Sequence, residues 1–335
     1  MKKLIHWFPA LIIGLFIFSG CDNDLELNAD SKDIPVVYGM FSLQDSAYYL
    51  RVERVFLEPG EDALELAQQP GQLYYDNILV QLKRSNPEKT VAMERVDGNQ
   101  EGYKRDEGIF AAAPNYLYKA KASDLQLSAG QTLTLEIDRG EGLPLVTAQT
   151  ILVETPVWRT TVPSDPINWE SGKVTRFSWS YGPETAFFDF RIRVRYEETL
   201  PTNPGQKEEK QLEWLIDDAI PADPNSTRHT AEVEGEAFFR FMGSAIPVID
   251  GAQRKFISMN PVVIAGGKEL AEFIRIKQAN TGLTGSELVP TYTNLSEGLG
   301  LFTSKSTASR GELTLTPPTR DSLRNGQFTK TLNFQ

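Results

Sequence analysis

The chain has 335 residues, and its 45 Asp and Glu outnumber its 34 Lys and Arg, which gives a formal net charge of -11. This acidic balance argues against a nucleic-acid partner, because nucleic acids are bound through basic surfaces. Hydrophobic residues make up 40% of the chain and aromatic residues 10%, which excludes a disordered chain and favours two folded domains at this length.

Residues 1–20 predict a lipoprotein signal peptide. Two lysines open it, and the mostly apolar run over 4–18 is too short for a membrane-spanning helix. Small residues, Ser19 and Gly20, then precede Cys21, the one cysteine of the chain. The alternative is a transmembrane anchor with an incidental cysteine. We expect a lipidated Cys21 that ties the mature protein to a membrane and takes no redox or metal-binding role.

Residues 21–33 form an expected acidic tether behind the lipid. Asp22, Asn23 and Asp24 follow the cysteine directly. Such a run resembles the surface-export signal of Bacteroidota lipoproteins, whereas in enterobacteria Asp in this place resembles an inner-membrane retention signal. A merely solvated tether is the third interpretation. The bacterial group that made the chain decides among the three.

From residue 34 onward the chain predicts short β-strands, because apolar and polar side chains alternate between turn signals. A proline-rich stretch over 156–166 indicates a connector or an irregular edge strand. We therefore expect a mainly β fold of two β-sandwich-like domains of immunoglobulin or fibronectin type, over 34–155 and 156–335, with a few short helices. The predicted strands of the first domain lie over 34–41, 48–53, 78–82 and 133–137.

In the second domain, 188–196 has the clearest alternation, and 211–216 is its expected partner strand. The aromatic cluster near 236–244 predicts a short helix, as does the region 61–69, which Pro70-Gly71 should end. Ile274 and Ile276 are assigned to a later strand, and the segment 265–268 to a turn between strands.

Catalytic residues are not expected. His229, the one histidine of the mature chain, lies in a polar stretch that predicts a solvated loop. Zinc needs several His or Cys ligands, so we expect no metal site and no cofactor. The adjacent acidic pairs point to opposite faces of any strand, so they do not converge as hydrolytic carboxylates and are interpreted as solvated loop charge. These pairs are Glu197–Glu198, Glu208–Glu209 and Asp217–Asp218.

Tyrosines remain as candidate contact residues, although most aromatics of a strand-rich domain belong to the core. Tyr48–Tyr49 and Tyr74–Tyr75 are adjacent pairs. In an extended chain the two members point in opposite directions, so one of each pair should be exposed to a ligand or a partner.

Several segments together resemble a family of Bacteroidota outer-membrane lipoproteins of undefined function, whose genes commonly lie beside those of TonB-dependent receptors. The most specific segment includes Asn294, Gly298, Leu299, Gly300 and Phe302. Its glycines should let the backbone bend or approach another strand closely while Leu299 and Phe302 pack. The segments that carry the resemblance are 34–39, 127–131, 147–150, 236–241 and 292–302.

The resemblance implies a Bacteroidota source, in which the acidic run signals export to the outer face of the outer membrane. It also implies an accessory subunit of a TonB-dependent receptor or another outer-membrane β-barrel complex, which captures a peptide or glycan ligand or supports assembly. The alternatives are a free-standing adhesion or structural module and a glycoside-acting enzyme.

Overall fold

A computed structural model describes residues 33–335 except 56–67, 107, 141, 161–162, 171 and 282–290. The predicted lipidation site Cys21, the run Asp22, Asn23 and Asp24, and most of the predicted helix over 61–69 lie outside the described residues. Across the described part, no helix is long and apolar enough to cross a membrane. The fold is mainly β, as predicted, with three sheets and a few short helices.

The N-terminal half is a sandwich of two sheets. Strands β1, β2, β6 and β5 lie side by side in one sheet, and the other sheet has the order β4-β3-β7-β8. Aliphatic side chains such as Leu50, Leu82 and Leu135 fill the space between them. The strand bounds are β1 Ile34–Phe41, β2 Ala47–Val55, β3 Leu79–Arg84, β4 Lys89–Ala92, β5 Glu94–Asp97, β6 Tyr116–Lys121, β7 Thr132–Asp138 and β8 Val146–Ile151.

The C-terminal half pairs a sheet of long strands, β12-β11-β14, with a smaller sheet, β13-β10-β9. The predicted pairing of 188–196 with 211–216 is confirmed, since Ile192 of β11 lies opposite Trp214 of β12. Aromatic rings dominate this core, among them Trp169 and Phe238, which stack with their ring centroids 5.6 Å apart. The bounds are β9 Val157–Trp158, β10 Val174–Ser180, β11 Phe187–Thr199, β12 Glu208–Pro221, β13 Arg228–Glu234 and β14 Gln253–Gly266.

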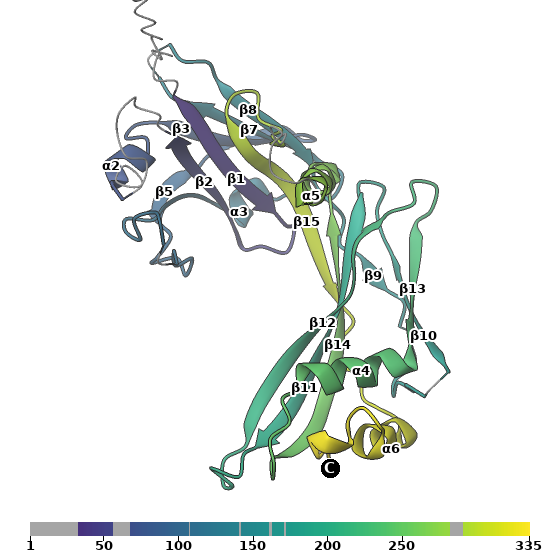
Figure 1. Cartoon of the computed structure of the whole chain (residues 1–335). Helices are drawn as coiled ribbons and strands as arrows, with labels where there is room; N and C mark the ends of the chain where they lie inside the picture. The colour runs from purple at the N-terminus through teal and green to yellow at the C-terminus, as the bar shows by residue number, and fades with distance from the viewer. Residues whose placement is uncertain are drawn as a thin grey trace, which may run out of the picture.

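Strand β15 (Leu299–Ser309) runs between the two halves, as Figure 1 shows. It joins their larger sheets into one sheet of eight strands. Its first part, through Ser304, runs parallel to β1, and its last part pairs antiparallel with β14. The two hydrophobic cores divide between Leu152 and Val153, and Leu295 and Phe302 return to the N-terminal core. The N-terminal sandwich is therefore completed by residues near the C-terminus.

The helices partly follow the predictions. The predicted helix near 236–244 is confirmed as α4 (Gly235–Ala245). Strand assignments for Ile274 and Ile276 are wrong, because both lie in α5 (Lys268–Thr281), which starts just after β14, where a turn between strands had been predicted. The apolar residues of this segment recur with a helical period, since Leu270, Phe273 and Ile274 pack in one cluster. The remaining helices are α2 Pro70–Leu73, α3 Ala122–Leu125, α6 Pro317–Asn325 and the 3-10 helix η1 Lys330–Leu332.

Candidate functional site

The outward face of β1 exposes two large apolar side chains. Tyr38 is 48% exposed and Met40 is 41% exposed. On one side of β1, α5 covers the neighbouring strand β15, where Leu270 packs with Leu301. On the other side, the loop over 98–115, between β5 and β6, lies against β2. The outward face of the sheet is therefore covered at β15 and β2, the two neighbours of β1, while β1 itself is exposed.

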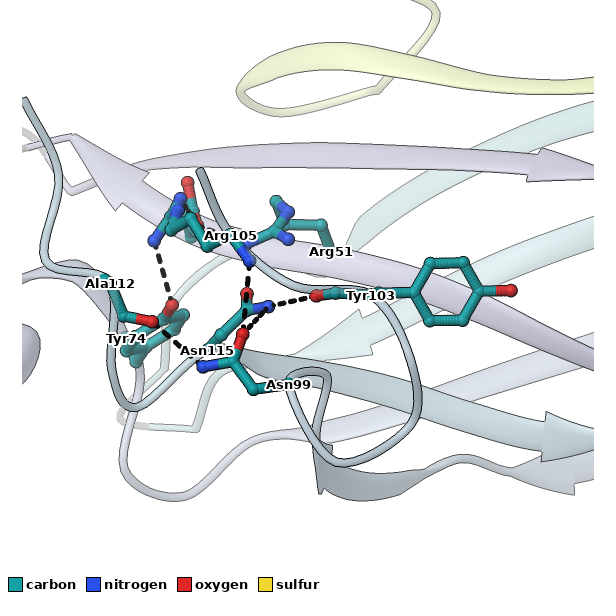
Figure 2. Close-up of polar contacts among 8 residues, drawn as sticks. Arg51, Tyr74, Asn99, Tyr103, Arg105, Ala112 and Asn115 are labelled. Atoms are coloured by element: carbon teal, nitrogen blue, oxygen red, sulfur yellow. Dashed lines mark hydrogen bonds and ion pairs between the residues drawn. The ribbon is translucent and has the colours of Figure 1, made fainter. Parts of the chain in front are cut away.

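Hydrogen bonds from Asn115 hold the 98–115 loop in place, as Figure 2 shows. This residue is fully buried, and its Nδ2 donates to the Tyr103 carbonyl at 2.7 Å and to Asn99 Oδ1 at 3.2 Å. Asn99 in turn donates to the Ala112 carbonyl at 2.9 Å and accepts from the Arg105 backbone N–H at 3.1 Å. Two amide side chains therefore replace regular pairing and hold both arms of the loop.

Arg105 is the charged centre of the loop. Its guanidinium lies against Glu53, which also accepts from Arg51 at 3.0 Å, and it donates to the Tyr74 hydroxyl at 3.1 Å. The same guanidinium lies 5.3 Å from the ring centroid of Phe110. Two arginines share one carboxylate, so the cluster of Arg51, Arg105 and Glu53 carries a net positive charge.

Tyr103 extends the exposed face toward β6. Its ring centroid is 4.6 Å from that of Tyr49, and its side chain is 51% exposed. The Tyr49 hydroxyl donates to Glu101 at 2.8 Å, and Lys119 donates to the same carboxylate at 2.6 Å. Burial and the bond to Glu101 raise the pKa of Tyr49, and the bond from Lys119 lowers the pKa of Glu101. These partners fix the Tyr49 ring under Tyr103.

These side chains form one surface, which we call the platform. Tyr38 lies opposite Arg51 in the β1–β2 pairing, so strand and loop contributions adjoin. Exposed aromatic rings beside arginines held in place are the side chains that dominate binding energy in protein interfaces. The platform consists of Tyr38, Met40, Arg51, Tyr103, Arg105 and Phe110.

The predicted motif residues surround the junction of β1 and β15. The side chain of Asn294 donates to the Phe302 carbonyl at 2.7 Å and accepts from the Phe302 N–H at 3.0 Å. It also donates to the Gln149 carbonyl of β8 at 3.2 Å. Phe302 is fully buried, with its ring centroid 4.9 Å from that of Phe41. Asn294 therefore ties both sheets of the N-terminal sandwich together.

The two glycines of the motif allow the close approach of β15 to β1. Gly298 has φ +94° and Gly300 has φ +129°. A Cβ on Gly300 would lie 1.9 Å from the Val37 carbonyl oxygen, and one on Gly298 would lie 2.2 Å from that of Pro35. Leu299 between them was expected to pack but is 38% exposed.

The tyrosine pairs behave differently from each other. Tyr48 is buried and Tyr49 half-buried, as alternation along β2 requires. Tyr74 and Tyr75 are both buried, so the prediction that one of them is exposed is wrong. They follow α2 in an irregular segment, where strand alternation does not apply; Tyr74 packs edge-on against Tyr116.

His229 does not lie in a solvated loop. It belongs to β13, opposite Trp179 of β10, and its ring is half-buried 4.9 Å from the Trp179 ring and 5.5 Å from that of Phe188. Burial lowers the pKa of His229, and the nearby charge of Asp217 opposes this shift. The residue is therefore a half-buried ring at the edge of the C-terminal sandwich.

The acidic pairs lie in strands β11 and β12, so their assignment to loops is wrong, whereas Glu208, Glu209, Asp217 and Asp218 are exposed to solvent as expected. Glu198 is buried and forms an ion pair with Arg254 at 2.7 Å, and Glu209 pairs with Arg195 at 2.5 Å. Glu197 and Glu198 lie opposite Lys255 and Arg254 of β14, but opposite Glu209 and Glu208 of β12. Ion pairs of Glu209 with Arg195 and of Glu208 with Lys210 offset the repulsion between these acids. Within the described residues no three His, Cys, Asp or Glu gather as metal ligands.

The sequence interpretation singled out two adjacent tyrosine pairs but not Tyr38, Met40 or Phe110. A signal was available in β1, where Val37 and Phe41 face the core while Tyr38 and Met40 place apolar side chains on the opposite face. Apolar residues on both faces of a strand indicate that both faces are covered within the protein, or that one face binds a partner.

No protein-family model matches the chain, and no curated protein matches it. The resemblance to Bacteroidota lipoproteins thus stays a prediction.

Proposed function

We propose that this protein is a lipid-anchored accessory subunit on the outer face of the outer membrane, and that it contacts a β-barrel protein, such as a TonB-dependent receptor, through the platform. The observation that carries the proposal is the platform itself: four apolar side chains between 41% and 51% exposed, set among arginines that Glu53 holds in place. Preorganised aromatic and arginine side chains lose little conformational entropy when a partner binds.

The attachment of the expected tether supports this orientation. Asp33, the last residue before β1, accepts from the Tyr75 hydroxyl at 2.6 Å and from Arg139 at 3.2 Å. The Arg139 side chain is 3% exposed and also donates to the Asp33 and Pro144 carbonyls. A buried guanidinium requires such partners, so the tether leaves the sandwich at a fixed point.

The platform is close to that point in the chain. Tyr38, on β1, lies five residues after Asp33, which corresponds to roughly 17 Å of extended chain. From Cys21 to Asp33 a fully extended chain spans at most roughly 40 Å. A lipid on Cys21 would therefore keep the platform within about 60 Å of the membrane, where the outer parts of a barrel protein are accessible.

Affinity isolation of the native lipoprotein from detergent-solubilised outer membranes tests the proposal. We expect a barrel protein to co-purify, and the double substitution Tyr38→Ser with Tyr103→Ser to reduce its recovery at least about tenfold, because central interface aromatics contribute about 2 kcal/mol or more. The matched control is Val248→Ser, which alters a 63% exposed side chain in the other half of the molecule. Recovery of no barrel, or equal recovery with the double variant, would refute the proposal.

The anchor has a test of its own. Cys21→Ser should move the protein from the membrane fraction to the soluble fraction and abolish labelling by radioactive palmitate. Ser19→Thr is the control within the same segment. Labelled Cys21→Ser protein would show that the lipid is attached elsewhere and would remove the anchor from the proposal.

A further inference from the structure

The outer face of the second N-terminal sheet contains a polar pocket of about 470 Å³. Its floor is a cross-strand row, Lys83 of β3, Thr134 of β7 and Gln149 of β8, which the strand register places side by side. Thr132 and Glu136 flank Thr134 on the same face of β7. The pocket lies on the opposite sheet from the platform and is independent of it.

The wall of the pocket is preorganised. The turn between β3 and β4, residues 85–88, is bound to the start of β7 by three hydrogen bonds. The Ser85 N–H donates to the Thr132 carbonyl at 2.9 Å, the Thr132 N–H donates to Ser85 Oγ at 2.9 Å, and Gln131 donates to the Asn86 carbonyl at 2.6 Å. The wall is therefore fixed before a ligand binds, and binding carries no cost for ordering a loop.

Several hydrogen-bonding side chains in the pocket form no hydrogen bond to another part of the described protein. Among the described residues, no hydrogen bond occupies the hydroxyl of Thr132 or Thr134, the side-chain amide of Gln149 or the carboxylate of Glu88. These groups combine donors with acceptors. A ligand rich in hydroxyl groups matches them, because each hydroxyl both donates and accepts.

The charges in the pocket balance. Lys83 and Arg84 are basic, Glu88 and Glu136 are acidic, and Lys83 pairs with Glu136 at 2.6 Å. The net charge of zero favours a neutral ligand over an anion or a cation. No aromatic or large aliphatic side chain lines the pocket, so the apolar side chains of a peptide would find no subsite.

We infer that this pocket binds a neutral carbohydrate through Thr134, Gln149 and Glu88. Thr134 and Gln149 would hold hydroxyl groups from the floor, and Glu88 would accept from the wall. The inference does not depend on a barrel partner, and it adds a ligand class that the platform does not determine.

Isothermal titration of the detergent-purified full-length protein tests the inference. The probes are neutral hexasaccharides of glucose, mannose, galactose and xylose, with a hexasaccharide of galacturonic acid as the charged comparison and an uncharged hexapeptide as the peptide comparison. We expect saturable binding of at least one neutral hexasaccharide. Gln149→Ala and Glu88→Gln should each weaken it roughly three- to tenfold, as expected for the loss of one hydrogen bond.

Gln81→Ala is the matched control, because Gln81 lies on the same face of the sheet, opposite Glu136, but outside the pocket. It should leave the affinity unchanged, and unchanged thermal unfolding of all three variants shows that they fold. The inference is overturned by failure of every neutral hexasaccharide to bind, by binding that Gln149→Ala and Glu88→Gln leave intact, or by tighter binding of the charged hexasaccharide or the peptide. None of these results bears on recovery of a barrel protein.

Discussion

The two halves of the molecule hold together by different means. The C-terminal half is built on rings: Trp158, Phe177 and Trp179 surround Phe190 with centroid distances of 5.1 to 6.0 Å. The core of the N-terminal half is mostly aliphatic, and it is closed by the segment around Asn294 and by strand β15 from the far end of the chain. Both halves are therefore stabilised by side-chain packing, aromatic in one and aliphatic in the other, and the N-terminal half also depends on backbone and side-chain hydrogen bonds at a long-range junction.

Phe190→Ala should have the largest effect. Phe190 is fully buried at the centre of the ring cluster, and truncation of such a side chain costs about 3–5 kcal/mol in the free energy of unfolding. Because the two cores are separate clusters, we expect hydrogen exchange to accelerate in β10, β11 and β14 and to stay slow in β3 and β7. Equal loss of protection in both halves would show that β15 couples them into one cooperative unit, and would break the comparison.

Gly300→Ala addresses the other half. The added Cβ would lie 1.9 Å from the Val37 carbonyl oxygen, at a φ that non-glycine residues rarely adopt, so β15 must separate from β1. We expect about 3 kcal/mol of destabilisation, measured by urea unfolding. Gly311→Ala is the control, since Gly311 also has a positive φ but open space around it. Similar costs for the two variants would mean that backbone strain, and not the close approach of the strands, determines the effect.

Asn294→Ala should cost about 2 kcal/mol, because it leaves the Phe302 N–H and carbonyl without their side-chain partner beside a buried core. Hydrogen exchange at Phe302 and at neighbouring β8 amides is the direct measurement. Asn294→Asp keeps the acceptor and loses the donors, so the Phe302 N–H should stay partly protected. An unchanged exchange rate in Asn294→Ala would contradict the role of this residue as the tie between the sheets.

The contrast between the halves also determines what the sequence could reveal. Strand β11 was predictable because Phe188 to Tyr196 alternate strictly and their partners follow along the chain. Helix α4 was predictable from its aromatic face. Helix α5 was not, because Ile274 and Ile276 are spaced like strand residues while the packing face also uses Leu270 and Phe273.

Features that depend on contacts between distant parts of the chain could not be predicted from local sequence patterns. The glycines at 298 and 300 indicated a close backbone approach, but no local pattern identifies β1 as the strand that they approach. The platform also depends on long-range contacts. Helix α5 covers β15 and the 98–115 loop covers β2, and the outward face of β1 between them stays exposed. Sequence reasoning could propose that some aromatic residues are exposed, but it did not single out Tyr38 or Phe110 and could not show the face that they share.

His229 gives the smallest effect, and it tests whether the C-terminal half depends on rings alone. Its half-buried ring packs near Trp179 and Phe188, and burial lowers its pKa below the ordinary 6.5. The unfolded chain therefore binds the proton more readily than the folded one. The stability contributed by neutral His229 is complete above the unfolded pKa and is lost as the pH falls through the folded value. The thermal unfolding midpoint should thus fall more between about pH 7.5 and about pH 5 in the unaltered protein than in His229→Phe, which keeps a ring but cannot titrate. An equal fall in both proteins would assign the acid sensitivity to carboxylates and leave His229 a ring like its neighbours.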